Sequence, residues 1–386
     1  MAIAPSPVRT ASRLQAGLER LCRSDLDPRS LIRALAERLR VAIPHQRLLL
    51  LRTDPTTVLP TDGVVEALPP ALCRPFWDNE LLEDDYNKFV ALARAEPVAA
   101  TLHQATGGQL ERSRRFRTIY RDLAVGDELR ASFTARDGSC WGIVQLVRTA
   151  GQIFTAAERD LLAGLAPVVA SALRARFALG SPAVPVPRGP AVVILDRSGE
   201  IQSITAQARQ WLAELTGGSG TGMTPLPEPV YAVAGRAWAA QAGRAAGPAC
   251  GQLRTVNQGW LHLQATCLEA GSPGAGGAGS SPGAGEVAAS QTGSVAVVLT
   301  PAQPPDLMPL LALGYRLTDR EQEVLRFLAR GMSTAEMTEQ LGISAHTVRD
   351  HIKALFAKVG VRSRAELLAR IFAEHYFERL EADVDR

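Results

Sequence analysis

Three glycines, Gly331, Gly342 and Gly360, divide the stretch from Tyr315 to Phe377 into short segments. Apolar residues recur three or four positions apart within each segment, as in an amphipathic helix, and glycine favours the left-handed conformation that closes a helix. A serine or threonine followed three positions later by glutamate, the capping-box spacing, marks three helix starts: Thr318 with Glu321, Ser333 with Glu336, and Ser363 with Glu366. The pattern predicts four short helices, with Ser344 as the cap of the third.

The second of these helices is only about two turns long, which is too short for stability on its own. It must therefore pack on its neighbours through a tight turn at Gly342. A short helix, a tight turn and a longer helix make a helix-turn-helix, in which Ala345 to Val359 would enter the major groove of DNA. The alternative is a four-helix packing module with no role in nucleic-acid binding.

This stretch closely resembles the LuxR-type helix-turn-helix domain, with matches at fixed spacing and no insertions. The residues that carry the resemblance are Leu317-Thr318, Arg320-Glu321, Glu323-Val324-Leu325, Gly331, Ser333, Glu336, Leu341, Ile343-Ser344, Thr347-Val348, His351, Lys358, Gly360-Val361 and Arg364. Two places depart from the usual pattern. Met337-Thr338 stands where the family usually has Ile-Ala, and Asp350 lies in the middle of the expected groove-facing side.

The resemblance implies that Arg349, Asp350 and Lys353, on the outward side of the third helix, reach the edges of the bases. Arg349 can bind guanine through two hydrogen bonds. Asp350 can accept from cytosine but repels phosphate, so it would restrict register rather than add affinity; the alternative is a salt bridge to Lys353 or Arg349. Phosphate contacts are expected from Ser344, His346, Thr347, His351 and Lys358, with Thr334 behind them.

The net charge of this segment is low for a DNA-binding domain. From Tyr315 to Tyr376, ten Arg and Lys oppose eight Asp and Glu, and the whole chain carries only +3. Electrostatic affinity for phosphate should therefore be modest for one domain. Two domains bound side by side would increase it, so we expect a homodimer on double-stranded DNA.

The N-terminal part predicts a sheet and several helices, among them helices over Asp85 to Glu96 and Gly108 to Ile119. Asp127 to Ala135 and Cys140 to Arg148 read as strands joined by an Asp-Gly turn, a hairpin pattern. Thr155 with Glu158 opens a long helix to about Leu179 whose apolar residues occupy two sides. One side would cover a sheet; the other would either meet a second subunit or be buried within the same domain.

Residues 12–179 resemble a GAF-type sensor domain, mainly from Asp127 onward. The resemblance implies a pocket between the sheet and the short helices, where a small molecule or protein signal would act. Aromatic residues from the middle of this region are the candidate lining, each with plain core packing as its alternative: Phe76, Trp77, Tyr86, Phe89, Phe116, Tyr120 and Trp141.

A proline-rich linker, 180–190, separates this region from the next one. Strands and helices over 191–300 resemble a PAS-like fold, interrupted by a Gly/Ala/Ser-rich loop at 270–293 that cannot bury a core. Residues 301–314 form a connector to the DNA-binding domain at 315–377. The expected fold class is a multidomain α+β protein followed by an all-α helix-turn-helix domain.

Catalytic, metal and cofactor sites are not expected. Gly217 to Thr224 lacks the lysine of a phosphate-binding loop, and the six histidines do not cluster. The acidic group Glu80, Glu83, Asp84 and Asp85 is interpreted as a solvated surface. The longest apolar runs are too short to span a membrane, and the first residues lack a targeting signal, so the expected location is the cytoplasm.

The sequence thus predicts a dimeric, non-enzymatic transcription regulator controlled by its N-terminal domains, with RNA polymerase as a further candidate partner. One rival is a redox or sulfoxide-reductase-type enzyme module that uses Cys73 and Cys140, with DNA binding secondary. Another is a ligand-free interaction scaffold. The odd number of scattered cysteines argues for reduced thiols.

Overall fold

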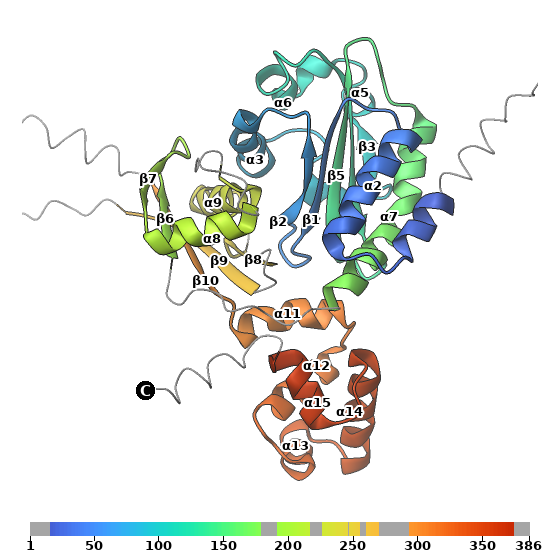
Figure 1. The fold of residues 1–386 in the computed structure, drawn as a ribbon, viewed down its shortest axis with the longest axis vertical. Helices are drawn as coiled ribbons and strands as arrows, with labels where there is room; N and C mark the ends of the chain where they lie inside the picture. Colours follow the sequence, from blue (N-terminus) through green and yellow to red (C-terminus); the bar gives the residue numbers. More distant parts are fainter. Residues whose placement is uncertain are drawn as a thin grey trace, which may run out of the picture.

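The fold is described by a computed structural model over residues 16–178, 191–216, 226–245, 247–254, 260–269 and 293–373. Figure 1 shows three parts: two units built on antiparallel sheets, and a helical domain below them. We call these the first sheet unit (16–178), the second sheet unit (191–301) and the C-terminal domain (315–373). None of the helices within these ranges has the length and apolar character needed to cross a membrane.

The first sheet unit has five strands in the order β2-β1-β5-β4-β3. The strands are β1 (Arg47–Thr53), β2 (Pro60–Glu66), β3 (Ala99–Thr101), β4 (Val125–Thr134) and β5 (Cys140–Thr149). The predicted hairpin is confirmed as β4–β5. Strands β1 and β5 are buried on both faces because helices cover both sides of the sheet.

Helices α2 (Pro28–Ala42) and α7 (Ala156–Ala178) pack on one face, against residues such as Leu48 and Leu50. The opposite face, which carries Leu49 and Leu51, packs against the second group of helices. The remaining helical segments are η1 (Pro70–Leu72), α3 (Cys73–Leu82), α4 (Phe89–Leu92), α5 (Leu102–Ala105), η2 (Leu110–Arg112) and α6 (Arg114–Thr118). The sheet therefore separates two layers of helices.

Two expected helices are shorter than predicted. Instead of one helix over Asp85 to Glu96 there is only α4, because Asn87 adopts a left-handed φ of 54° and interrupts the turn before it. Over Gly108 to Ile119 only η2 and α6 form, with Ser113 capping α6. Strands β2 and β3 were not predicted; β2 begins with Pro60 and contains Gly63, an atypical strand composition that an edge position tolerates.

The second sheet unit repeats the connectivity of the first. Its strands are β6 (Ala191–Leu195), β7 (Ile201–Ile204), β8 (Cys250–Arg254), β9 (Trp260–Cys267) and β10 (Val295–Pro301), and its helices are α8 (Ala206–Thr216) and α9 (Glu228–Gln241). The order β7-β6-β10-β9-β8 places the first and last strands together at the centre, as in the first sheet. A turn at Asp196 to Gly199 joins β6 to β7. The predicted linker 180–190 and nearly all of the loop 270–293 lie outside the described residues.

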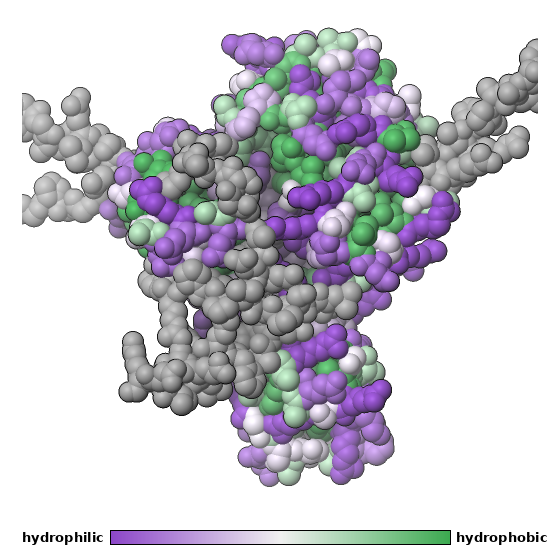
Figure 2. Space-filling view, in the orientation of Figure 1, coloured by the Kyte–Doolittle hydropathy of each residue, from purple (hydrophilic) through white to green (hydrophobic). Residues whose placement is uncertain are grey.

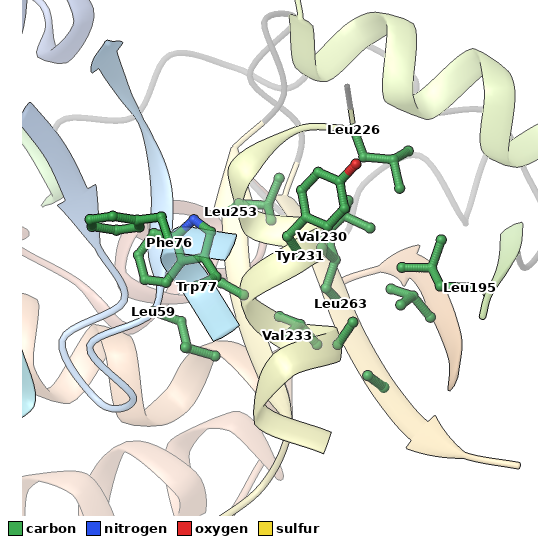
Figure 3. Packing of buried hydrophobic residues seen from close by; sticks show 14 of the residues in the cluster. Leu59, Phe76, Trp77, Leu195, Leu226, Val230, Tyr231, Val233, Leu253 and Leu263 are labelled. Atoms are coloured by element: carbon green, nitrogen blue, oxygen red, sulfur yellow. The ribbon is translucent and has the colours of Figure 1, made fainter. Parts of the chain in front are cut away.

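The two sheet units share one hydrophobic core. Helix α9 is buried along most of its length and packs against α3 of the first unit. Figure 3 shows Phe76 and Trp77 of α3 facing Val230 and Val233 of α9. Polar contacts reinforce the junction: the Asp54 carboxylate accepts a hydrogen bond from the backbone N–H of Gln252 at 3.1 Å. The units therefore form a continuous body rather than two separately packed domains.

The long helix α7 is largely covered within the chain. Leu162, Leu165, Val169 and Leu173 are buried against the sheet and α2. Thr155 and Glu158 form the predicted reciprocal cap at its start. The exposed side carries small residues: Gly164, Pro167, Ser171 and Ala175. The two-sided apolar pattern is therefore explained mainly by burial inside the first sheet unit.

The C-terminal domain is reached through helix α11 (Pro304–Gly314), the predicted connector. Its helices are α12 (Asp319–Ala329), α13 (Thr334–Leu341), α14 (Ala345–Val359) and α15 (Arg364–Leu368), followed by a π-helical turn at Ala369–Ala373. The four predicted helices are confirmed. One apolar core unites them with α11, through residues such as Leu310, Val324 and Leu355.

Candidate nucleic-acid interface

Local sequence fixes the start and end of α13 and α14. At α13, Glu336 accepts from the Ser333 amide at 2.6 Å, and Ser333 accepts from the Glu336 amide at 3.3 Å. Gly342 ends the helix with φ of 64°. The Ser344 hydroxyl then accepts from the Thr347 amide at 3.1 Å and caps α14. These bonds satisfy free backbone amides at both helix starts, so the turn is held in a single geometry.

One side of α14 is held by the core of the C-terminal domain. Val348, Leu355 and Val359 are buried, and α14 packs against both α12 and α13. Met337 fills the core of α13, and the Thr338 hydroxyl bonds to the Thr334 carbonyl one turn earlier at 2.8 Å. The Met-Thr departure from the family pattern is thus accommodated, because the threonine hydroxyl has a partner.

The other side of α14 is open to solvent. Arg349, Asp350 and Lys353 are all exposed, and Figure 2 shows hydrophilic residues along the side of the domain where α14 lies in Figure 1. Within the described ranges, Arg349 and Lys353 have no hydrogen bond or ion pair. Two cations on a solvent-facing helix side are free to bind an anionic or guanine-rich surface.

Asp350 has a different partner from the one predicted. Its Oδ2 atom lies 3.0 Å from Nδ1 of His346, one turn earlier on the same helix. The alternative considered for Asp350, a salt bridge to Lys353 or Arg349, is not formed among the described residues; its contact with cytosine stays a prediction. The i, i+4 spacing places the short aspartate side chain against His346, whereas Arg349 is adjacent along the helix and points elsewhere.

Lys358 is bound within the domain. Its Nζ atom donates to Glu321 Oε2 at 2.6 Å and to the Arg316 carbonyl at 2.9 Å. Burial raises the pKa of Glu321, but hydrogen bonds from Lys358 and Thr318 outweigh it and hold that pKa below its usual range. Lys358 thus ties the end of α14 to the start of α12, and its contact with phosphate stays a prediction.

The remaining predicted DNA contacts lie at the start of α14 or beside it. Ser344, His346 and Thr347 are exposed at the first turn, where free amides and the helix dipole favour phosphate. His351 and Thr334 are half-buried. The exposed members of the predicted set other than Lys358 thus lie at the cap or in the first half of α14, whereas Lys358 lies near its far end.

The predicted pocket residues divide into several locations. Phe76 and Tyr120 line a cavity of about 210 Å³ between the sheet units, while Trp141 lines a much smaller one of about 30 Å³ near α11. Trp77 and Phe89 are buried in the shared core, and Tyr86 and Phe116 are half-buried beside it. Sequence reasoning missed Gln145 and Glu228 in the larger cavity, because they belong to different units and only the fold brings them together.

The predicted acidic surface near residue 80 is only partly correct: Asp84 is exposed and Glu83 partly exposed, but Glu80 and Asp85 are not on a solvated surface. The side chains of Glu80 and Asp85 are almost wholly buried: Glu80 accepts from Arg130 at 2.8 Å, and Asp85 accepts from the Arg115 amide at 2.6 Å. Glu128 bridges the two arginines, 2.6 Å from Arg115 and 3.0 Å from Arg130. This ionic network fills the region under α3, α4 and α6.

The described part of the chain shows how its cysteines and other potential metal ligands are placed. No three His, Cys, Asp or Glu residues there are grouped as a metal site would need. The five cysteines are free thiols, and burial raises the pKa of both Cys73 and Cys140. Thiols with raised pKa values are poor nucleophiles at neutral pH.

Comparison with known proteins defines the class of the C-terminal domain. Residues 315–371 match the family described as bacterial regulatory proteins, luxR family, so this domain is a LuxR-type helix-turn-helix domain. The match covers the four helices of the domain and agrees with the resemblance in the sequence.

Individual relatives match over a limited part of the chain. The transcriptional regulatory protein DesR of Bacillus subtilis is 37% identical over 75 residues, 19% of this chain and 38% of the relative. The transcriptional regulatory protein UhpA of Salmonella typhimurium is 41% identical over 70 residues, 18% and 36% respectively. The bialaphos biosynthetic pathway regulatory protein of Streptomyces hygroscopicus is 48% identical over 54 residues, 14% and 21%. The chain spans less than two fifths of the length of these curated relatives.

Proposed function

We propose that the chain is a DNA-binding transcription regulator in which α14 reads the major groove. The observation that carries the proposal is the presence of two exposed cations, Arg349 and Lys353, on the second helix of a helix-turn-helix. Neither of them has a hydrogen bond or ion pair within the described residues. The regulatory names of the relatives support it. The low charge of the domain favours binding as a dimer, with two recognition helices on two half-sites.

Replacing Arg349 with alanine should weaken binding to the preferred DNA site by about 1–3 kcal/mol and relax the preference at one base pair. The guanidinium is free to form two hydrogen bonds to a guanine, and alanine can form none. The site is first selected from randomised duplexes with the wild-type chain. Fluorescence anisotropy at a fixed salt concentration then compares the variants.

Arg320→Ala is the matched control for this measurement. It removes the same side chain from α12, where Arg320 is exposed and pairs with Glu323. Base preference should stay unchanged in this control. If Arg349→Ala kept both the affinity and the base preference of the wild type, α14 would not be the reading helix.

The sheet units contact the connector helix α11 through a cluster of aromatic rings that pack at tilted angles. Phe177 at the end of α7 lies 5.6 Å from Trp141 of the first unit and 5.0 Å from Trp260 of the second, measured between ring centroids. Its ring also contacts Gly314 so closely that a Cβ there would lie 2.7 Å from it. Gln252 donates to the Asp306 carbonyl of α11 at 3.0 Å. A change in how the sheet units pack would therefore change the contacts that hold α11.

Control of DNA binding by the sheet units follows from this contact. A small molecule or partner protein that favours one packing of the units would shift the population of α11 orientations, and with it the spacing of two recognition helices. The GAF-like and PAS-like character of the units, the dimer, RNA polymerase as a partner and action in the cytoplasm belong to this proposal. The shared connectivity of the two sheets supports the likeness of the two units to each other, and the position of α11 supports a route from these units to the C-terminal domain.

Phe177→Ala tests this route. The substitution removes two aromatic contacts, which should loosen α11 by about 1–3 kcal/mol. Hydrogen exchange measured by mass spectrometry should show faster exchange in α11 peptides, with the strands of both sheets unchanged. Phe116→Ala, which truncates a half-buried ring on α6, is the control and should leave α11 unchanged. If α11 exchanged equally fast in Phe177→Ala and in the wild type, the aromatic contacts of Phe177 would not transmit the signal.

A catalytic role is not part of the proposal. The rival redox module would need reactive thiols at Cys73 and Cys140. The Cys140 side chain is instead buried, within hydrogen-bond distance of the Gly142 carbonyl at 3.4 Å, and Cys73 is half-buried. Raised thiol pKa values at both positions favour a structural role.

A further inference from the structure

The cavity of about 210 Å³ between the two sheet units has a floor made by one row of residues across the first sheet. Val65 pairs with Leu49, and Leu49 pairs with Gln145, so the three side chains lie next to one another on one face. The next residue in the row is Arg130, which pairs with Gln145 and belongs to the buried ionic network. The cavity therefore begins where the ionic network ends.

Gln145 carries a buried polar group that has no partner. Its Oε1 atom accepts from Arg130 at 2.8 and 3.1 Å, and arginine can only donate, which fixes the orientation of the amide. Among the described residues, the buried Nε2 atom has no hydrogen-bond partner. Gln145 lines the cavity and Arg130 does not, so the unsatisfied amide belongs to a residue of the cavity wall. A buried N–H group without a partner is costly, unless a bound molecule supplies an acceptor.

The rest of the wall is apolar and comes from both units. Leu72 and Phe76 belong to the first unit, and Leu226 to the second. Glu228, at the start of α9, accepts from Nε1 of Trp77. The Glu228 carboxyl is thus already engaged at the rim, which leaves the Gln145 amide as the free polar group inside.

The cavity also has a path to solvent. An adjoining groove of about 600 Å³ shares Val65 and Glu228 with it. Val65 lies on the edge strand β2 and is 42% exposed, so a ligand can enter past it. A cavity of about 150 Å³ lined by apolar side chains is sufficient for benzene, so the space here accepts one substituted ring.

We propose that this cavity is a binding site for a compact, uncharged, mainly apolar carbonyl compound about the size of a substituted benzene ring. The ring packs on Leu49, Phe76 and Leu226, and the carbonyl oxygen accepts from Nε2 of Gln145. The ligand contacts both sheet units and stabilises the arrangement in which they are packed together. The binding site stands by itself; its use as a regulatory input rests on the proposed function.

Titration calorimetry on the full chain tests the site with two probes, acetophenone and α-methylstyrene. The second has a CH₂ group in place of the carbonyl oxygen and otherwise the same shape. Acetophenone should bind saturably to one site, and α-methylstyrene roughly three- to tenfold more weakly, the effect of one net hydrogen bond. If neither probe binds saturably, the proposal is overturned.

Two variants separate the carbonyl contact from the cavity. Gln145→Glu keeps an acceptor for Arg130 and removes the N–H donor, so the preference for acetophenone should disappear. Val65→Trp fills the cavity from its exposed edge and should weaken the binding of both probes at least tenfold. Ile153→Trp, at an exposed position away from the cavity, should change neither. Urea unfolding confirms that each variant is folded.

Either of two results at the variants contradicts the site: unchanged binding by Val65→Trp, or an unchanged preference in Gln145→Glu. The DNA measurements are separate from these titrations. If the chain binds acetophenone but no DNA, the site holds and the proposed function fails. If it binds DNA but neither probe, the proposed function holds and the site fails.

Discussion

Replacing Glu128 with alanine is expected to lower the free energy of unfolding of the sheet units by about 3–5 kcal/mol. The substitution leaves Arg115 and Arg130 buried without the carboxylate that lies between them. All three side chains are 0% exposed, so water cannot replace the lost contacts. Urea unfolding followed by tryptophan fluorescence measures the change. All five tryptophans lie in the sheet units, so the C-terminal domain does not contribute.

Glu323→Ala is the control for this substitution. Glu323 and Arg320 form an exposed pair, for which a loss of no more than about 1 kcal/mol is expected. A change at Glu128 as small as that at Glu323 would show that the buried network contributes little. Such a result would also mean that the two arginines find other partners or water.

The pH dependence gives a second measurement of the same network. Burial raises the pKa of Glu128, but the charges of Arg115 and Arg130 outweigh it and hold that pKa below its usual value of 4.5. A lowered pKa means that the carboxylate stabilises the fold above pH 4.5 and that this stability is lost as the pH falls through the folded-state pKa. The stability difference between wild type and Glu128→Gln should therefore be constant above pH 4.5 and shrink below it.

Alternation along β4 explains why this network could not be predicted from the sequence. Glu128, Arg130 and Ser132 alternate with Leu129, Ala131 and Phe133, as in a strand with one face in water. The polar face is instead covered by α3, α4 and α6 and satisfied by partners far away in the chain, such as Glu80. Local spacing shows which residues share a face, but it does not show what covers that face.

Helix ends, by contrast, are local properties, and those of the C-terminal domain were predictable. The caps at Thr318, Ser333 and Ser344, and the glycines at 342 and 360, depend on residues within one turn of the chain. The exposed positions of Arg349 and Lys353 follow from the same periodicity. The partners of Asp350 and Lys358 do not, because several residues within reach compete for each of them.

The cavity between the two sheet units shows most clearly what the sequence alone does not predict. Phe76 and Tyr120 were predicted to line a pocket because aromatic residues cluster in that part of the sequence, and both line the cavity. Gln145 in β5 and Glu228 in α9 lie outside that cluster and in different units. Their convergence depends on how the second sheet unit packs on the first, which no local pattern encodes.

Trp77→Ala should separate the two sheet units, at a cost of about 3–5 kcal/mol. The side chain is 2% exposed, packs edge-on against Phe76 at 5.2 Å, and donates to Glu228 of the second unit. Its loss leaves a cavity in the shared core and removes a hydrogen-bond donor from Glu228. Hydrogen exchange measured by mass spectrometry should then show β6 and β10 losing protection at a lower urea concentration than β1 and β5.

Trp211→Ala provides the control, because Trp211 is buried on α8, which packs on β6 of its own unit. Both variants lose a fully buried indole, but only Trp77 belongs to the contact between α3 and α9. Trp211→Ala should therefore weaken the second unit without exposing α3, whereas Trp77→Ala should raise exchange in both α3 and α9. If the strands of both sheets still lost protection together in Trp77→Ala, the units would be coupled through other contacts, such as those of Asp54 with Gln252.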